Sequence, residues 1–175
     1  VYQSIKDPYL TFIKYDIRLV TPKLLGCVDT IINLAAISND PASELNPEQT
    51  QSINHIAAVE LAKSGKTAGV RLYLFASSCS VYGSGEMVLT EESELAPVSE
   101  YARSKIAAEK ELLPMADHAF GVTILRMGTL HGLSASRMRF DLIINLMTLH
   151  AWKNNKIYIM GGGKQWRPLL HIDDA

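Results

Sequence analysis

Two short stretches of the chain carry side chains suited to moving a proton at a sugar or alcohol oxygen. In the first, SSCSVYG at residues 77–83, the hydroxyls of Ser78 and Ser80 alternate at the end of an apolar run. In the second, YARSK, Tyr101 and Lys105 are four residues apart, so on a helix their side chains leave the same face. A free phenol has a pKa of about 10, and a nearby ammonium lowers that pKa by stabilising the phenolate. The pattern predicts a Tyr101 base assisted by Lys105, with one of the two serines hydrogen-bonded to the same substrate oxygen.

Each stretch also has a plainer interpretation. A Tyr-x-x-x-Lys pair occurs on surface helices, where the lysine stem lies along apolar surface, and a run of serines is typical of a polar loop. The chemistry would also need a bound nicotinamide, yet neither Gly-x-Gly-x-x-Gly nor Gly-x-x-Gly-x-x-Gly stands anywhere in the 175 residues. Only the two stretches together favour catalysis.

Length and composition predict one ordinary globular unit. Of the 175 residues 47% are hydrophobic, and 17 basic against 18 acidic residues give a formal charge of −1. This balance favours neither a nucleic-acid partner nor a membrane surface, and no apolar run approaches the ~18 residues that span a bilayer. Cys27 and Cys79 belong to no Cys-x-x-Cys pair, and no two histidines have metal spacing. We therefore expect no metal site and a cytoplasmic chain with reduced thiols.

Short apolar runs alternate with helical patterns along the chain. Asn46-Pro47-Glu48 is a typical helix start, because asparagine caps, proline suits the first turn and glutamate favours the positive end of the helix dipole. Strands alternating with helices predict a parallel sheet built from right-handed crossover units. The sequence predicts strands at residues 11–15, 30–35, 71–76, 122–125 and 156–160, and helices from Asn46 to about Ser64, from about Ser99 to about Pro114 and from Phe140 to Trp152.

The polar residues that follow each predicted strand are the candidate site, because ligands of such sheets bind outside the carboxyl ends of the strands. They are Asp16, the segment 35–40, the segment 77–80, and Gly128-Thr129. Asp16 is suited to accept a hydrogen bond from an adenine amino group, or is simply solvated. Asn54 either orders the backbone near the crevice or faces solvent.

Arg167 and the glycines before it are candidates for phosphate binding. A guanidinium binds a pyrophosphate in a fork, although Arg167 between Trp166 and Pro168 is equally typical of an exposed loop. Gly161-Gly162-Gly163 is followed by no helix start, so it predicts a turn and not a phosphate cradle.

Seven motifs occur in one order along nearly the whole chain. They are Tyr15-Asp16-Ile17-Arg18, Asn33-Leu34-Ala35-Ala36, Asn54, Ser77 to Gly83, Pro97-x-Ser99-x-Tyr101-x-x-Ser104-Lys105, Leu125-Arg126, and Arg167 to Asp174. Together they resemble the extended short-chain dehydrogenase/reductase family, in its NAD-dependent nucleotide-sugar epimerase/dehydratase branch of the UDP-glucose 4-epimerase type. The resemblance implies an α/β fold with a Rossmann-like doubly wound parallel sheet, and NAD as the cofactor.

The resemblance also implies roles for individual residues. Ser78, Tyr101 and Lys105 would be catalytic, with Tyr101 and Lys105 also holding the nicotinamide ribose. The expected NAD contacts are Asp16, Ile17, Leu34, Ala35, Ala36, Asn54, Tyr101, Lys105 and Gly128. The expected nucleotide-sugar contacts are Ser80, Thr129, Asn145, Leu146, Tyr158, Met160 and Arg167, the last of them at the pyrophosphate.

Departures from the family pattern narrow the expected reaction. Family 4,6-dehydratases carry Asp-Glu in the place of Cys79-Ser80, and a thiol with a hydroxyl does not replace that acid and base. Related decarboxylases usually carry glutamate at the position of Ser80. The resemblance therefore implies epimerisation of a nucleotide-diphosphate sugar through a transient 4-keto intermediate. Thr129 stands where many epimerases have asparagine, so the hexose stays open, as does the nucleotide.

The family's glycine loop lies between its first strand and first helix, whereas this chain starts with Val1 close to the expected third strand. We therefore expect a fragment that lacks the first strand-helix-strand unit and the C-terminal part of the substrate lobe. Residues 1–135 would form a partial NAD-binding Rossmann-like domain and residues 136–175 the start of the nucleotide-sugar-binding region. Similar enzymes often dimerise through two long helices, one bearing the catalytic tyrosine, which makes a homodimer an expectation by analogy.

Two other functions stay open. One is an NADPH-dependent reductase of a 4-keto nucleotide-sugar, since the strand end that distinguishes NAD from NADP is not in this sequence. The other is a non-catalytic module that binds a nucleotide-sugar or a full-length partner. The missing glycine loop favours that module, and the retained Ser78, Tyr101 and Lys105 disfavour it.

Overall fold

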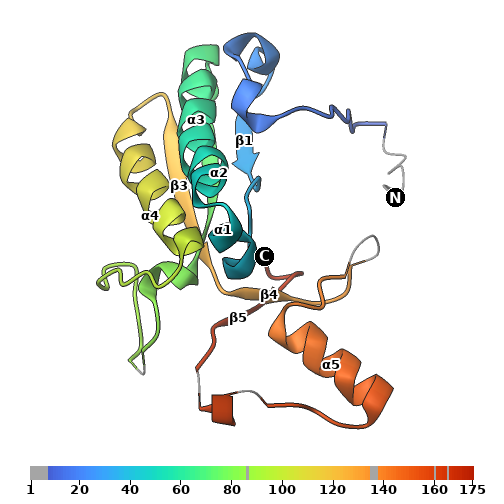
Figure 1. Cartoon of the computed structure of the whole chain (residues 1–175). Coiled ribbons are helices and arrows are strands. Elements are labelled where there is room, and N and C mark those ends of the chain that lie inside the picture. Colours follow the sequence, from blue (N-terminus) through green and yellow to red (C-terminus); the bar gives the residue numbers. More distant parts are fainter. Residues whose placement is uncertain (1–7, 86, 135–137, 160, 165) are drawn as a thin grey trace. The chain divides into compact units, whose positions relative to one another are not determined.

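The structure, a computed structural model, describes residues 8–85, 87–134, 138–159, 161–164 and 166–175. The chain divides into two compact units (Figure 1). The larger unit is Lys14–Arg126, and the smaller one combines Val1–Ile13 with Met127–Ala175. The predicted domain boundary at residue 135 stays a prediction, and the two units are described separately below.

The larger unit contains a three-stranded sheet in the order β1-β2-β3. Its strands are β1 (Thr30–Asn33), β2 (Leu72–Ser78) and β3 (Gly121–Met127). Strands β1 and β2 are parallel, with Thr30 opposite Leu72, and the Gly121 amide donates to the Arg71 carbonyl at 2.7 Å, so β3 starts at the same edge as β2. These three predicted strands are confirmed. Strand β1 ends two residues early because the Asn33 side chain accepts the Ala35 amide at 3.1 Å and turns the chain.

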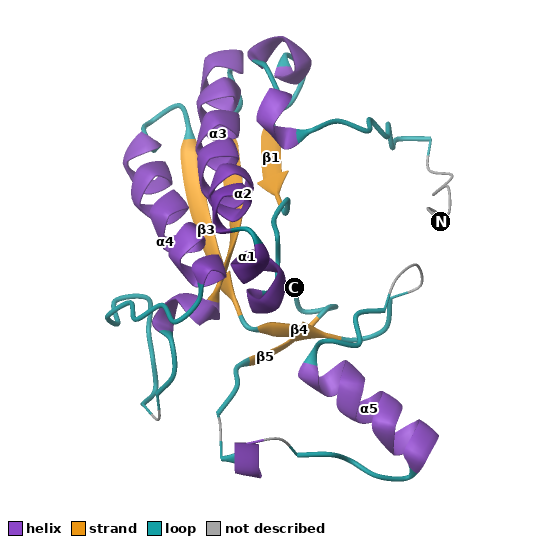
Figure 2. Ribbon diagram, in the orientation of Figure 1, coloured by secondary structure: helices purple, strands orange, loops and turns teal. Residues whose placement is uncertain are grey.

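Helices cover one face of this sheet, and Figure 2 shows them beside the strands. The predicted helix start is confirmed: the Asn46 side chain caps the Gln49 amide at 3.0 Å, and Pro47 begins the first turn. That helix runs further than predicted, to Ala68, where Gly69 takes a left-handed φ of 85° and ends it. The elements are η1 (Ile17–Leu19), η2 (Pro22–Leu25), α1 (Asp40–Leu45), α2 (Pro47–Gln51), the π-helical η3 (Ser52–Ile56), α3 (Ala57–Ala68), η4 (Cys79–Tyr82), α4 (Glu100–Leu112) and η5 (Leu113–Met115).

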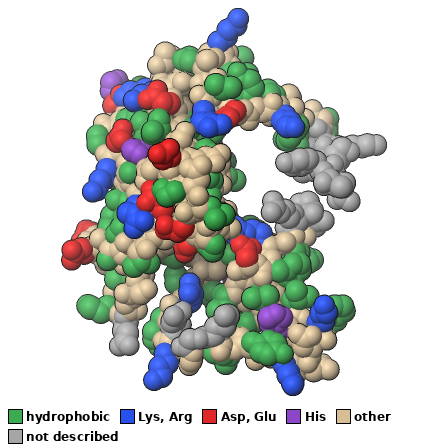
Figure 3. Space-filling view, viewed as in Figure 1, with side chains coloured by type: hydrophobic (Ala, Val, Ile, Leu, Met, Phe, Trp, Pro, Cys, Tyr) green, Lys and Arg blue, Asp and Glu red, His purple; other side chains and the backbone are tan. Residues whose placement is uncertain are grey.

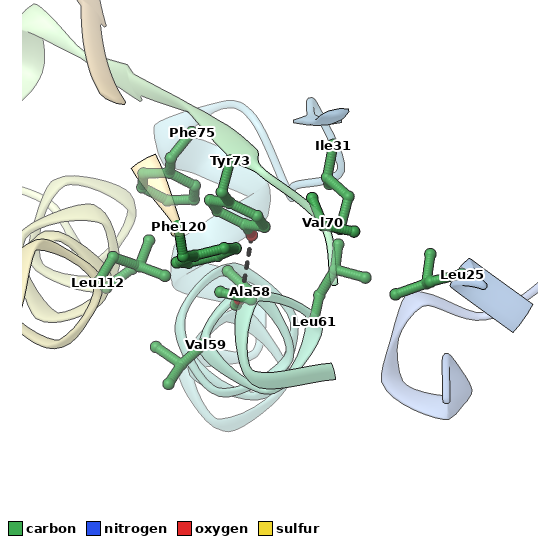
Figure 4. Close-up of a cluster of buried hydrophobic side chains, with 12 residues drawn as sticks. Leu25, Ile31, Ala58, Val59, Leu61, Val70, Tyr73, Phe75, Leu112 and Phe120 are labelled. Atoms are coloured by element: carbon green, nitrogen blue, oxygen red, sulfur yellow. Dashed lines mark hydrogen bonds between the residues drawn. The ribbon is translucent and has the colours of Figure 1, made fainter. Parts of the chain in front are cut away.

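The core of the larger unit lies between α3, α4 and the sheet. Figure 4 shows apolar side chains from both helices against Tyr73 and Phe75 of β2. The Tyr73 hydroxyl is fully buried, where it donates to the Ala58 carbonyl at 2.8 Å and accepts from the Asn33 amide at 2.8 Å. Burial strongly raises the pKa of Tyr73, so this phenol stays neutral and joins β1, β2 and α3.

The smaller unit is built around a two-stranded sheet. Strands β4 (Thr129–His131) and β5 (Leu169–His171) are parallel, with His131 opposite His171, and they are accompanied by α5 (Ile143–Asn154) and the 3-10 turn η6 (Gly161–Gly163). The sequence predicted neither strand, because three-residue strands carry too little pattern. Helix α5 starts three residues later than predicted, and the glycine run forms a turn as expected.

Two predicted strands are wrong. Residues 11–15 and the described residues 156–159 belong to neither sheet, and Met160 lies outside the described residues. Both segments have the β-branched and aromatic composition of strands, and several of their side chains, such as Phe12 and Ile159, are exposed. A strand also requires a neighbouring strand to hydrogen-bond, and local composition does not reveal whether one is present.

The surface shows no dominant charge of one sign on the face in Figure 3, where basic and acidic side chains are interspersed over the described residues. In the part of the chain that the structure describes, every helix is too short or too polar to cross a membrane.

Replacing Leu112 by alanine tests the core. Its side chain is fully buried, so Leu112→Ala should lower the free energy of unfolding by about 2–5 kcal/mol through lost burial and a residual cavity. Leu113, its neighbour, is 51% exposed, and Leu113→Ala should cost less than about 1 kcal/mol. Urea unfolding of both variants measures the difference, and equal losses would contradict this packing.

Candidate functional site

Helix α4 carries Tyr101 and Lys105. The Ser99 side chain caps the helix by accepting the Ala102 amide at 3.2 Å, which satisfies one of the free amides of the first turn. The Tyr101 amide donates to the Ser43 hydroxyl of α1 at 3.2 Å. The first turn of α4, where Tyr101 lies, is therefore held from two sides.

Lys105 is almost fully buried, with 2% of its surface exposed. Its ammonium donates to the Ala76 carbonyl of β2 at 2.8 Å, lies 4.6 Å from the centre of the Phe75 ring and 5.7 Å from the centre of the Tyr101 ring. Burial lowers the pKa of Lys105 to about 8, and the nearby Glu109 carboxylate opposes that shift. The ammonium is thus placed beside the phenol ring, as the four-residue spacing predicted.

The two serines of the candidate site lie on one turn at the end of β2. The Ser78 oxygen accepts the Ser80 amide at 3.2 Å and the Ser80 hydroxyl at 3.0 Å. Gly83 ends this turn with a φ of 72°, and a Cβ there would lie 2.1 Å from the Ala96 carbonyl oxygen, so only glycine fits. Since Lys105 binds the carbonyl of Ala76, two residues before Ser78, the serine turn and the middle of α4 meet at one end of β2.

Asn54 joins the loop after β1 to α4. Its side-chain oxygen accepts the Ile37 amide at 2.8 Å, and its nitrogen donates to the Ile37 carbonyl and to the Ser104 hydroxyl, both at 3.1 Å. Ser104 in turn donates to the Tyr101 carbonyl at 2.8 Å. Asn54 lies in the π-helical turn η3, a feature common at functional sites. Asn54 is fully buried, so the interpretation of this residue as a solvent-facing asparagine is wrong.

The loop held by Asn54 contains three predicted cofactor contacts. Leu34 is 69% exposed, Ala35 is exposed and Ala36 is half-buried. They lie next to the carboxyl end of β1, the edge at which ligands of parallel sheets bind. Their contact with NAD stays a prediction.

Asp16 and Ile17 lie in the larger unit, and the strand expected before them is absent from the described residues 8–15. The Asp16 carboxylate accepts the Arg18 backbone amide at 2.9 Å and the guanidinium at 2.6 and 3.0 Å. Hydrogen bonds from Arg18 lower the pKa of Asp16 to about 2, so it is ionised at neutral pH. Ile17 is half-buried and packs against the core. The adenine contact stays a prediction, and an adenine amino group would share a carboxylate that already binds Arg18.

The remaining predicted contacts lie in the smaller unit. Asn145 of α5 is buried, donates to the Arg139 carbonyl at 2.9 Å and accepts the Gly132 amide at 3.4 Å, so its amide already holds the loop between β4 and α5. Tyr158 is 55% exposed, with its ring edge-on to His150 at 5.2 Å. Of the others, Gly128, Thr129 and Leu146 are half-buried, Arg167 is exposed, and Met160 is not described.

Sequence reasoning missed a buried polar cluster beside the catalytic candidates. Glu109 lies four residues after Lys105 and is 2% exposed, and it forms an ion pair with Arg126 at 2.6 Å. A glutamate in phase with Tyr101 and Lys105 on one helix face was the available signal.

The described residues contain no group of three histidine, cysteine or acidic side chains placed to hold a metal. A pocket of about 660 Å³ between Lys66, Arg71 and Phe120 lies by the starts of β2 and β3. Ser78 lies at the other end of β2.

Residues 4–175 match the sequence pattern of the NAD dependent epimerase/dehydratase family. The chain belongs to this family. Among curated relatives, the Bacillus subtilis protein YtcB, described as an uncharacterized UDP-glucose epimerase, is 30% identical over 169 residues. The match covers 94% of this chain and 52% of YtcB, so the chain spans about half the length of this relative.

Solved structures of the family have the same fold. The UDP-glucuronic acid 4-epimerase of Bacillus cereus, in complex with UDP-glucuronic acid and NAD, superposes with a TM-score of 0.79 at 26% identity, covering 93% of this chain and 52% of that one. The dTDP-glucose 4,6-dehydratase DesIV of Streptomyces venezuelae, with NAD bound, gives 0.81 at 27% identity, covering 98% and 53%. Epimerases and a dehydratase are thus similarly close, so side-chain chemistry has to distinguish the reactions.

The buried ammonium predicts how stability changes with pH. Because the pKa of Lys105 is about 8 in the folded state and 10.5 for a free lysine side chain, the unfolded chain binds more protons between these pH values. The free energy of unfolding should therefore rise through this window, by on the order of 2 kcal/mol, relative to Lys105→Met, which has no such group. Urea unfolding of both proteins from pH 7 to 10 measures the difference. A difference in the free energy of unfolding that stays constant or falls as pH rises would contradict the burial of this ammonium.

Proposed function

We propose that this chain carries the catalytic residues of an NAD-dependent epimerase that inverts C4 of a nucleotide-diphosphate sugar through a transient 4-keto intermediate. The observation that carries the proposal is the Lys105 ammonium, held by the Ala76 carbonyl and 5.7 Å from the Tyr101 ring. A phenol beside a buried ammonium at the carboxyl end of a parallel strand is suited to remove a proton from a sugar hydroxyl.

Each of the three catalytic candidates has one task. Tyr101 takes the proton of the C4 hydroxyl when the sugar is oxidised and returns it when the ketone is reduced. Lys105 lowers the free energy of the phenolate electrostatically, at a position fixed by its bond to β2. Ser78 donates to the same sugar oxygen. The Ser80 hydroxyl donates to the Ser78 oxygen, so the hydrogen of the Ser78 hydroxyl stays available for the sugar.

The residues present fit a dinucleotide. An exposed Leu34 and the small side chains of Ala35 and Ala36 leave room beside the end of β1, and Asn54 holds this loop against α4. When bound there, NAD would accept hydride from C4 and return it to the opposite face. Tyr101 and Lys105 would also hold the nicotinamide ribose, with Asp16, Ile17 and Gly128 as further contacts.

The nucleotide-sugar contacts form the second part of the proposal. Arg167 supplies an exposed guanidinium suited to a pyrophosphate, and Tyr158 presents an exposed aromatic ring. The full set is Ser80, Thr129, Asn145, Leu146, Tyr158, Met160 and Arg167. Relatives include a UDP-glucose 4-epimerase and a dTDP-glucose 4,6-dehydratase, so UDP- and dTDP-sugars are the substrates to test first.

Replacing Tyr101 by phenylalanine tests the proposed base. Tyr101→Phe should lower the rate of C4 inversion of a UDP-hexose by about 10²–10⁴-fold, because the proton acceptor is removed. Calorimetric titration should still show NAD binding, weakened by no more than the one ribose hydrogen bond that Tyr101 loses, and Tyr9→Phe, at a 96% exposed tyrosine, should leave the rate unchanged. Full activity of Tyr101→Phe would make the assignment wrong, and NAD binding without any turnover by the unaltered chain would favour a binding module.

The side chains at Cys79 and Ser80 predict that no water is eliminated. Elimination across C5 and C6 needs an acid and a base, whereas the Ser80 hydroxyl is hydrogen-bonded to Ser78 at 3.0 Å. Incubation with NAD and UDP-glucose or dTDP-glucose should therefore give only products of unchanged mass. Mass spectrometry checks this, and a product lighter by one water molecule would show dehydratase chemistry instead.

A further inference from the structure

A buried ion pair connects α4, β2 and β3. The Glu109 carboxylate accepts three hydrogen bonds from the Arg126 guanidinium of β3, at 2.6, 3.0 and 3.3 Å, and accepts the Ser77 hydroxyl of β2. Glu109 is 2% exposed, and 18% of the Arg126 side chain is exposed. Hydrogen bonding to Glu109 raises the pKa of Arg126, so the guanidinium stays charged. Three elements thus share one hydrogen-bonded joint.

The same guanidinium reaches the far end of the serine turn. Arg126 donates to the Tyr82 hydroxyl at 2.9 Å and to the Glu91 carbonyl at 3.0 Å, and its central carbon lies 5.1 Å from the centre of the Tyr82 ring. Ser77 stands directly before Ser78, and Tyr82 is the last residue of η4. The ion pair therefore holds the serine turn on both sides.

Stability alone does not account for this arrangement. Removing two charges from water is costly, and apolar side chains of similar volume often stabilise a fold equally well. What an ion pair adds is direction, because a forked guanidinium and a carboxylate bond only in a narrow range of geometries. Glu109 is also one turn beyond Lys105 and two beyond Tyr101 on α4, so it is in phase with both.

We propose that Glu109 and Arg126 are positioning residues, which lock the serine turn against α4 and so fix Ser78 relative to Tyr101 and Lys105. Neither residue acts on the sugar directly. The inference rests on the proposed function for its catalytic meaning, whereas the locking itself is a property of the fold that can be measured without turnover.

Hydrogen exchange of the turn tests the locking in the chain itself. Two amides report on it, since Ser80 donates to the Ser78 oxygen and Gly83 donates to the Ser80 carbonyl. In Glu109→Gln, which keeps the shape but removes the charge, both amides should exchange about tenfold faster while α3 amides exchange as before. Tyr82→Phe, a milder change that removes one acceptor of Arg126, should produce a smaller acceleration at the same amides. Glu60→Gln is the matched control, because its partner Lys63 forms an exposed pair at 2.7 Å on α3.

Kinetics then separate this inference from the proposed function. Glu109→Gln should lower kcat about tenfold or more with KM for the nucleotide-sugar within about twofold, since the substrate contacts stay while the alignment of the reacting groups is lost. The variant also removes the carboxylate charge that raises the pKa of Lys105, whereas Tyr82→Phe leaves that charge in place, so a smaller loss of kcat in Tyr82→Phe isolates the alignment. Unchanged exchange at Ser80 and Gly83 in both variants, or uniform acceleration that includes α3, would overturn the positioning role whatever the turnover. Suppose that the unaltered chain binds NAD without turnover, and that the variants still exchange faster at Ser80 and Gly83. That result would uphold the locking and contradict the epimerase proposal.

Discussion

The hydrogen bond between the Lys105 ammonium and the Ala76 carbonyl joins the two parts of the candidate site. A buried ammonium is costly, and here a carbonyl oxygen and the faces of two aromatic rings, Phe75 and Tyr101, replace part of its lost hydration. Because the acceptor belongs to β2 and the donor to α4, the bond sets where the helix lies along the strand. The phenol and the serine turn acquire their places from this constraint.

Buried polar side chains have the same role elsewhere in the larger unit. Asn33 and Tyr73 shape the end of β1, Asn54 ties the following loop to Ser104, and Glu109 pairs with Arg126. Among the described residues, every buried side-chain nitrogen or oxygen has a hydrogen-bond partner. Apolar burial under α3 supplies the driving force for folding, whereas these directional contacts gather at the carboxyl ends of the strands, where geometry matters for chemistry.

Family membership and fold leave the reaction undecided. The chain resembles the B. cereus 4-epimerase and the S. venezuelae 4,6-dehydratase about equally, with TM-scores of 0.79 and 0.81. The difference between such reactions depends on the acid and base groups around the sugar, and in the proposed site those positions are Cys79 and Ser80. Proposals about the reaction therefore rest on a handful of side chains and not on the architecture that carries them.

Local patterns in the sequence determined the parts of the fold whose signal is local. They include the three strands of the larger sheet, the capped start at Asn46 and the shared face of Tyr101 and Lys105, because caps and side-chain periodicity act within a few residues. The same patterns failed at residues 11–15 and 156–159, where strand-like composition found no neighbouring strand in the described chain. Only the tertiary structure decided the contacts of Asn54 with Ser104 and of Glu109 with Arg126. The two residues of the first pair are 50 positions apart and those of the second pair 17 positions apart. No local signal specifies which distant groups a folded chain brings together.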